Sequence, residues 1–166
     1  RRVRCPRRGE KESPMSVVHE TLVFERCLRA SMETVFAGYA DVGVRAAWSA
    51  PSPTAAVVYS SDDFRVDGSD VFRCGSATDL RFLGVVRYLD ILEGQRIVYS
   101  ETISMSEARL AASLVTWDLS ADGSGTRLVV TDQITSFVGQ EMIDGSRAGM
   151  IGALDNLVEL LDKKRR

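Results

Sequence analysis

The chain has 166 residues, of which 45% are hydrophobic and 27% are charged, a composition typical of a globular protein and not of a disordered or fibrous one. A chain of this length can bury roughly two-thirds of the surface that it exposes when unfolded, so a single domain needs neither disulfides nor metal for stability. The three cysteines show no CxxC spacing and there is one histidine, which excludes a metal site of the zinc-finger type and argues against a disulfide framework.

Charge is distributed unevenly along the chain. Residues 1–14 carry six basic and two acidic side chains, whereas residues 15–166 carry 15 basic and 21 acidic ones. Because phosphate binding needs a basic face, the acidic remainder argues against a nucleic-acid partner. Residues 1–14 lack hydrophobic periodicity, so we expect a disordered basic arm followed by one domain over residues 15–164. Met15 leaves open a second explanation, in which the arm is upstream translated sequence.

The sequence shows no sign of a membrane span or a secretory signal. No apolar run approaches the roughly 18 residues that a spanning helix needs, and the basic N-terminus lacks an apolar core segment. Unpaired cysteines fit a reducing compartment. We therefore expect a cytoplasmic protein.

The first patterned segments predict a strand and two short helices. Residues 17–28 are rich in β-branched and aromatic side chains and alternate as a strand does. Ser31 is a candidate N-cap for a helix with apolar side chains at helical spacing. We expect Gly43 to end that helix and a second short helix to end at Trp48.

The rest of the chain predicts a meander of strands and one long helix. Residues 56–136 contain about six strand patterns separated by turn signals such as EGQ and DGSG, and the short connections favour antiparallel neighbours. Residues 140–164 repeat apolar side chains every three or four positions, as an amphipathic helix does. Only this helix is long enough to cover the apolar face of the sheet. The fold class is therefore α+β, with a curved antiparallel sheet of about six or seven strands, two short helices and a long C-terminal helix.

Several motifs follow this order of elements: S-x-E-x-V-F-A from Ser31, a tryptophan at 48, D-F-R-V-D-G from Asp63, E-G-Q-R-I-V-Y from Glu93, G-T-R-L-V-V-T from Gly125, and D-G with A-L-D-N-L between Asp144 and Leu157. Together they resemble the START-like (SRPBCC) superfamily with its helix-grip, or Bet v 1-like, fold. The most similar branch is the Activator of Hsp90 ATPase homologue family in its small, stand-alone bacterial form. Two positions depart from that pattern, Asp67 in place of a glycine and Met150 in place of an aromatic residue.

The resemblance implies a cavity between the long helix and the sheet, which the superfamily uses for lipids, sterols, polyketides and other apolar ligands. We expect no cofactor, and a homodimer remains an open possibility. Aromatic and apolar side chains on the predicted strands and helices are candidates to line the cavity, with a carboxylate among them: Trp48, Phe72, Phe82, Tyr88, Tyr99, Glu101, Ile103, Trp117, Met150 and Leu154. Each aromatic residue could instead belong to a filled core.

Glu101 is the most informative of these candidates. Strand alternation places it on one face with Tyr99 and Ile103. A carboxylate among apolar neighbours has a raised pKa, which suits a general acid or a ligand anchor. The alternative is that the end of the sheet is solvated and Glu101 faces water or pairs with an arginine.

Other residues with reactive side chains show no convincing catalytic or metal-binding pattern. His19 has no partner for a catalytic triad and is expected on the surface of a strand. Cys27 and Cys74 are expected as small buried hydrophobic residues. The acidic segment of residues 62–70 lacks calcium-loop spacing and is expected to be a solvated hairpin.

Three functions remain open on these grounds. The first is a non-enzymatic binding protein for a small hydrophobic molecule or lipid. The second is an enzyme of the polyketide cyclase/aromatase type that uses the same cavity, with Glu101 or a tyrosine moving a proton. The third is a module that contacts an Hsp90-type chaperone. The absence of a catalytic constellation favours the first.

Overall fold

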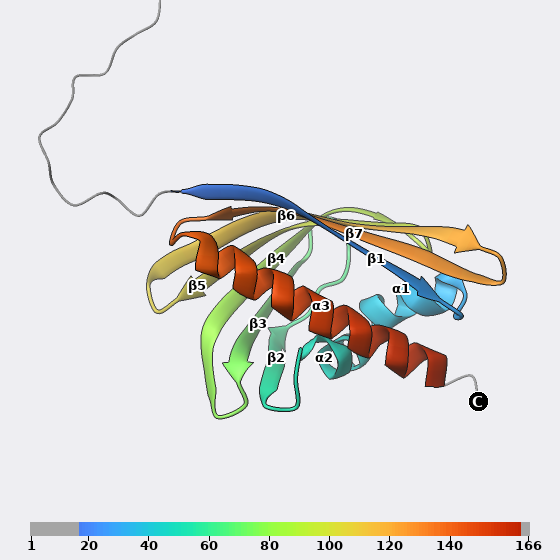
Figure 1. Ribbon diagram of the computed structural model, residues 1–166, viewed down its shortest axis with the longest axis horizontal. Helices are drawn as coiled ribbons and strands as arrows, with labels where there is room; N and C mark the ends of the chain where they lie inside the picture. The colour runs from blue at the N-terminus through green and yellow to red at the C-terminus, as the bar shows by residue number, and fades with distance from the viewer. Residues whose placement is uncertain (1–16, 164–166) are drawn as a thin grey trace, which may run out of the picture.

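The computed structural model describes residues 17–163, so the predicted arm at residues 1–14 and the start at Met15 lie outside the described part of the chain. Within residues 17–163 there are seven strands and three helices (Figure 1): β1 Val18–Leu28, α1 Met32–Ala40, α2 Val42–Ser49, β2 Ala55–Ser61, β3 Ser69–Ser76, β4 Asp79–Leu92, β5 Arg96–Met105, β6 Ala108–Asp122, β7 Gly125–Ser136 and α3 Gln140–Lys163.

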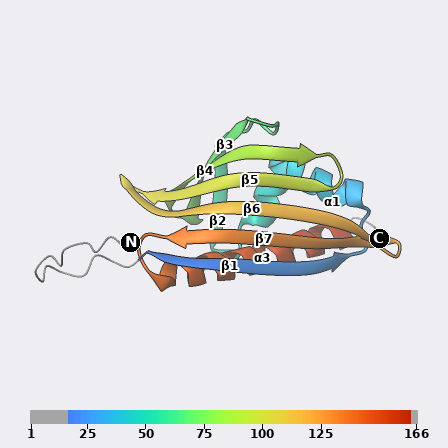
Figure 2. The ribbon, with the colours of Figure 1, turned by 90° about the horizontal axis from the view of Figure 1, so that it is seen from above.

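All seven strands form one antiparallel sheet in the order β1-β7-β6-β5-β4-β3-β2. Strands β2 to β7 are a meander, and β1 joins the last strand, with Val18 opposite Ser136 and Leu28 opposite Thr126. Register shifts between β2 and β3, β3 and β4, β4 and β5, and β5 and β6 interrupt the ladders. Such bulges bend strands and increase their twist, and the sheet is strongly curved, as Figure 2 shows from above. The predicted fold class is confirmed.

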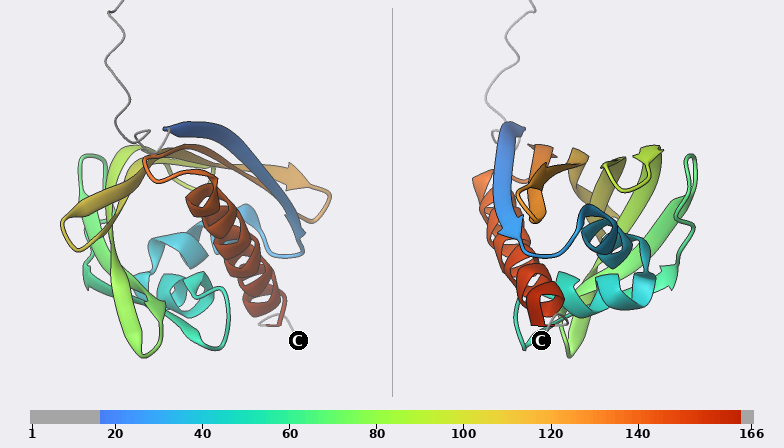
Figure 3. Two further views of the ribbon diagram at one scale, coloured as in Figure 1. Left: turned by 60° about the vertical axis from the view of Figure 1, so that its left-hand side comes forward. Right: turned by 90° about the vertical axis from the view of Figure 1, so that its right-hand side faces the viewer.

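The three helices lie on the concave side of the sheet (Figure 3). Helix α3 packs against β1, β7, α1 and α2, while α1 contacts β6 and β7 and α2 contacts β2. Within residues 17–163, the principal helix–sheet contacts therefore leave out β3, β4 and β5. The middle of the sheet is the part that the helices cover least.

Capping residues explain where the short helices begin and end. The Ser31 side chain accepts a hydrogen bond from the Thr34 amide, as the N-cap prediction requires. Asp41 ends α1 and caps α2, because its carboxylate accepts a hydrogen bond from the Val44 amide at 2.9 Å. The prediction that Gly43 breaks the helix is wrong: Gly43 lies inside α2, and Asp41 makes the break.

The core lies between the inner face of the sheet and the helices. Alternate residues of β1 and β7 are buried, including Leu22 and Phe24 of β1 and Leu128 and Val130 of β7, whereas the edge strand β2 has no buried residue. One inner-face position carries no side chain. A Cβ on Gly84 would lie 2.1 Å from the Phe72 ring, which occupies that space from the neighbouring strand.

Candidate functional site

Strand register arranges the inner-face side chains in rows that cross the sheet. One row runs through Tyr88 of β4, Tyr99 of β5, Val115 of β6 and Asp132 of β7. The adjacent row runs through Val86, Glu101, Ser113 and Ile134. Two carboxylates thus lie in neighbouring rows of an otherwise mainly apolar and aromatic face, separated by strand β6.

An aromatic cluster lies between the inner face of the sheet and the short helices, around the row that contains Tyr88 and Tyr99. Its centre is Tyr39 of α1, whose ring centroid lies 4.9 Å from that of Trp117 and 6.0 Å from that of Tyr99. Trp48 of α2 contacts Trp117 at 5.6 Å, and Tyr88 contacts Tyr99 at 6.1 Å. Edge and tilted contacts at these separations are favourable, so this region is a packed aromatic core.

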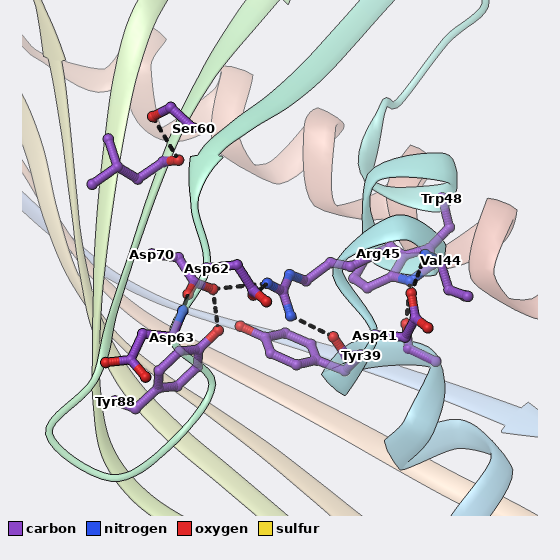
Figure 4. A network of polar contacts seen from close by, with 12 residues as sticks. Tyr39, Asp41, Val44, Arg45, Trp48, Ser60, Asp62, Asp63, Asp70 and Tyr88 are labelled. Carbon is purple, nitrogen blue, oxygen red and sulfur yellow. Dashed lines mark hydrogen bonds and ion pairs between the residues drawn. The ribbon is translucent and has the colours of Figure 1, made fainter.

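A buried arginine joins helix α2 to the segment between β2 and β3 (Figure 4). Arg45 is 2% exposed and donates hydrogen bonds to the Tyr39 carbonyl at 2.5 Å, to Asp62 at 2.6 Å and to Asp70 at 2.8 Å. Asp70 also accepts from the Tyr88 hydroxyl and, at 2.8 Å, from the Asp63 amide. The network pairs the buried charges of Arg45 and Asp70 with each other and with neighbouring dipoles, while the Arg45 Nε has no hydrogen-bond partner among the described residues.

This network corrects the expectation of a solvated acidic hairpin. Asp70 is 1% exposed and Asp63 is half-buried, although Asp62 and Asp67 do lie at the surface. Aromatic rings flank the arginine as well, since its guanidinium carbon lies 5.0 Å from the Tyr39 centroid and 4.8 Å from the Tyr59 centroid. The buried Arg45 binds this segment to helix α2, and the acidic composition of the segment gives no sign of that contact.

Glu101 is half-buried, and its surroundings remove it from bulk water. Burial, together with the nearby charge of Asp132, raises the pKa of Glu101 to about 7. After burial itself, the charge of Glu101 helps to raise the pKa of Cys74 to about 11. It also contributes to the raised pKa of Tyr59, on the edge strand β2. The charge of Glu101 is thus felt by side chains of β2 and β3, and its expected alternative, an ion pair with an arginine, is found nowhere in residues 17–163.

Asp132 and Trp117 contribute polar atoms without partners. Asp132 is 7% exposed, and its Oδ1 has no hydrogen-bond partner among the described residues. Burial raises the pKa of Asp132, and a hydrogen bond from Ser113 opposes that rise. The indole Nε1 of Trp117, which is 1% exposed, is likewise without a partner in residues 17–163. Native proteins leave few such groups buried, so the unpaired atoms call for an explanation.

The candidate lining residues divide into two groups. Six are deeply buried in the core: Trp48, Phe72, Tyr88, Tyr99, Trp117 and Leu154. The other four are half-buried: Phe82, Glu101, Ile103 and Met150. Ile103 and Met150 pack against the core, whereas Phe82 lies outside it. Most of the aromatic candidates thus pack on one another, and the half-buried group lies toward the less covered middle of the sheet or on α3.

Sequence reasoning missed Asp132, Arg45 and Asp70. Asp132 could have been found, because strand alternation places it on the same face as the buried Val130 and Ile134. Arg45 could not, because one arginine in a short helix gives no sign of burial. Its partners are Asp62, in the segment before β3, and Asp70, in β3 itself. Both are distant from Arg45 in the sequence and meet it only in the folded chain.

The other reactive side chains lie away from the inner face or are unactivated. His19 is exposed, as predicted, on the outer surface, where it lines a shallow groove of about 570 Å³ together with Thr135. The prediction that Cys27 is buried is wrong, since it is exposed; Cys74 is half-buried. Within residues 17–163 no cluster of three or more His, Cys, Asp and Glu could hold a metal ion, and no helix is both long and apolar enough to cross a membrane.

Comparison with known proteins connects the chain to one family. The model for the family described as Activator of Hsp90 ATPase homolog 1-like protein matches residues 29–162. The crystal structure of Mll3558 from Rhizobium loti is similar, with 33% identity, a TM-score of 0.77, and coverage of 87% of this chain and 98% of that one.

A protein from Rhizobium leguminosarum is 28% identical with a TM-score of 0.75, covering 89% of this chain and 97% of that one. DynU16, a putative protein in the dynemicin biosynthetic locus, shares the fold at 13% identity and a TM-score of 0.64, covering 85% of this chain and 46% of that one. No curated protein sequence matches the chain.

Proposed function

The chain belongs to the Activator of Hsp90 ATPase homolog 1-like family, and from that premise we propose that it binds a small, mostly apolar molecule on the inner face of its sheet. The site that we propose is the part of the inner face where strand register brings together the half-buried Cys74, Phe82, Glu101 and Ile103, with the half-buried Met150 of α3 as a further candidate. We call it the Glu101 recess.

One observation supports this proposal above the others. Glu101 and Cys74 both keep exposed surface, yet burial is the first cause of the raised pKa of each. Each side chain is thus desolvated by the surrounding protein while part of it stays within reach of a small molecule. Ligand sites are typically concave and mostly apolar, with a few polar groups to orient the ligand, and the recess has that composition.

Ligand screening by thermal unfolding tests the proposal. A molecule that binds the folded state at ten times its dissociation constant stabilises it by about 1.4 kcal/mol. For a domain of this size that corresponds to a rise of roughly 3–5 °C in the midpoint of unfolding. Replacing Ile103 by a bulkier residue, in Ile103→Trp, fills the recess and should abolish the rise. If no lipid, sterol or aromatic compound raises the midpoint in the original protein, binding in the recess is refuted.

A second candidate is a proton-transferring enzyme of the cyclase type. The observation that favours it is the pKa of Glu101 near 7, because a general acid or base works best when its pKa is close to the working pH. Glu101→Gln should then remove turnover of a reactive polyketide-like substrate while ligand binding stays intact. Unchanged turnover would reject the role. The likeness to DynU16 supports the shared fold alone, and the chaperone-contact alternative rests on the family alone.

We also retain the prediction of a reducing, cytoplasmic setting. Its support is that both described cysteines, Cys27 and Cys74, are free thiols.

A further inference from the structure

The inner face carries more negative than positive charge once its ion pairs are assigned. Glu20 of β1 is bound by Arg147 of α3, and Asp70 is bound by Arg45. Among the described residues, neither Glu101 nor Asp132 forms an ion pair with a basic side chain. Arg45 and Arg147 are thus already paired with other carboxylates, and so is Arg26 of β1, whose partner is Asp155.

The unpaired acceptor of Asp132 makes this more than a cluster of acidic residues. Its Oδ1 is buried on the inner face without a hydrogen-bond donor, although Ser113 contacts the same carboxylate. Leaving an acceptor of this kind unsatisfied in a folded protein is costly. A bound group that donates hydrogen bonds and carries positive charge would satisfy it.

Aromatic rings lie beside the same row. Tyr99 lies in one row with Asp132 and two positions before Glu101 on its own strand, and its ring contacts that of Tyr39, which in turn contacts Trp117. Carboxylates together with aromatic faces are the groups that bind organic cations in proteins. A carboxylate or phosphate headgroup, in contrast, would meet like charge here and no free cation.

We propose that the ligand of the Glu101 recess is an amphipathic amine, whose protonated nitrogen lies between Glu101 and Asp132 and whose apolar part lies along Ile103 and Met150. This inference rests on the proposed binding function and specifies its ligand class. The raised pKa values of both carboxyl groups agree with it, because burial raises each of them and the charge of Asp132 adds to the rise at Glu101.

Three probes of equal chain length separate this inference from the binding function itself. Decylamine, decanol and decanoate are titrated separately below their aggregation concentrations, with binding followed by calorimetry at pH 8. We expect decylamine to bind about tenfold or more tightly than decanol, as charge-assisted hydrogen bonds to a partly buried carboxylate predict, and decanoate to bind most weakly.

Isosteric variants locate the preference. Asp132→Asn and Glu101→Gln, each measured alone after circular dichroism confirms folding, should reduce the preference for amine over alcohol to about threefold or less. Glu20→Gln is the matched control, because it removes an inner-face carboxylate that Arg147 already neutralises, and it should keep the full preference.

The outcomes are distinct. If decanol and decylamine bind equally, or if the preference survives in both variants, the amine assignment is overturned while the binding function stands. If none of the three probes binds, the recess does not accept simple apolar chains and the proposed function fails with it.

Discussion

A carboxyl group whose pKa is near 7 in the folded protein and near 4.5 in the unfolded chain makes folding stability depend on pH. Below both values Glu101 is protonated in both states. Between them the folded protein keeps a proton that the unfolded chain has released. The free energy of unfolding should therefore fall as pH rises from about 4.5 to 7, by roughly 2–3 kcal/mol from this residue.

Glu101→Gln removes that dependence. We expect its stability relative to the original protein to rise steadily from pH 5 to pH 8, measured by urea unfolding at each pH. The unfolding free energy of the Glu101→Gln variant should still depend somewhat on pH, because burial also raises the pKa of Asp132. Glu107→Gln, at an exposed turn, is the control and should run parallel to the original protein. A constant difference between Glu101→Gln and the original protein would contradict the burial of this carboxyl group.

A second residue-scale prediction concerns the contact between Gly84 and the Phe72 ring. An added methyl group would overlap ring atoms at 2.1–2.5 Å, so Gly84→Ala should cost about 1–3 kcal/mol of unfolding free energy. Gly145→Ala is the matched control, since nothing lies within 4 Å of a Cβ there and alanine favours helix by about 1 kcal/mol. Equal unfolding midpoints for the two variants would show that Phe72 moves aside freely.

At the scale of elements, Arg45 connects α2 with the β2–β3 segment and β3. Arg45→Met removes the cation and leaves Asp70 buried without it, which should cost about 3–5 kcal/mol in unfolding free energy. Arg65→Met changes an exposed arginine of the same segment and should cost less than about 0.5 kcal/mol.

The double variant Arg45→Met with Asp70→Asn separates charge from packing. Because both partners of the ion pair are then neutral, part of the lost stability should return. If Arg45→Met alone costs no more than Arg65→Met in urea unfolding, the buried pair contributes nothing to holding the segment.

The elements themselves were predictable from periodicity and turn chemistry, because both signals are local. The alternation before Leu28, the cap at Ser31 and the repeat in α3 all correspond to observed elements. The break between the short helices was misassigned to Gly43, since an aspartate can cap two helices in a way that composition does not reveal.

The site was predictable only in part, for a physical reason. Glu101 could be assigned to the inner face from strand alternation alone, and the structure places it there. Its relation to Asp132 depends on the pairing of β5, β6 and β7, and that of Arg45 to Asp70 depends on how α2 packs. Both are tertiary facts that no short window of sequence encodes.

At the scale of the whole molecule, one aromatic core joins the helices to the sheet. Trp48 of α2 and Trp117 of β6 are 4% and 1% exposed and lie in contact. Tryptophan fluorescence and far-UV circular dichroism should therefore report a single urea transition with the same midpoint. Separate midpoints would show that the helices and the sheet unfold independently.

The placement of β1 determines the order in which the sheet can assemble. The meander from β2 to β7 grows by hairpins between successive strands, each needing only short loops to close. Strand β1 pairs solely with β7 among the described strands, across more than 95 residues, as the pairing of Leu28 with Thr126 shows. During synthesis β1 is made before the other strands of the sheet. Its backbone groups stay unpaired until β7, the last strand, has also been made. Its closure onto β7 is therefore a late and slow step, as expected for long-range strand pairing.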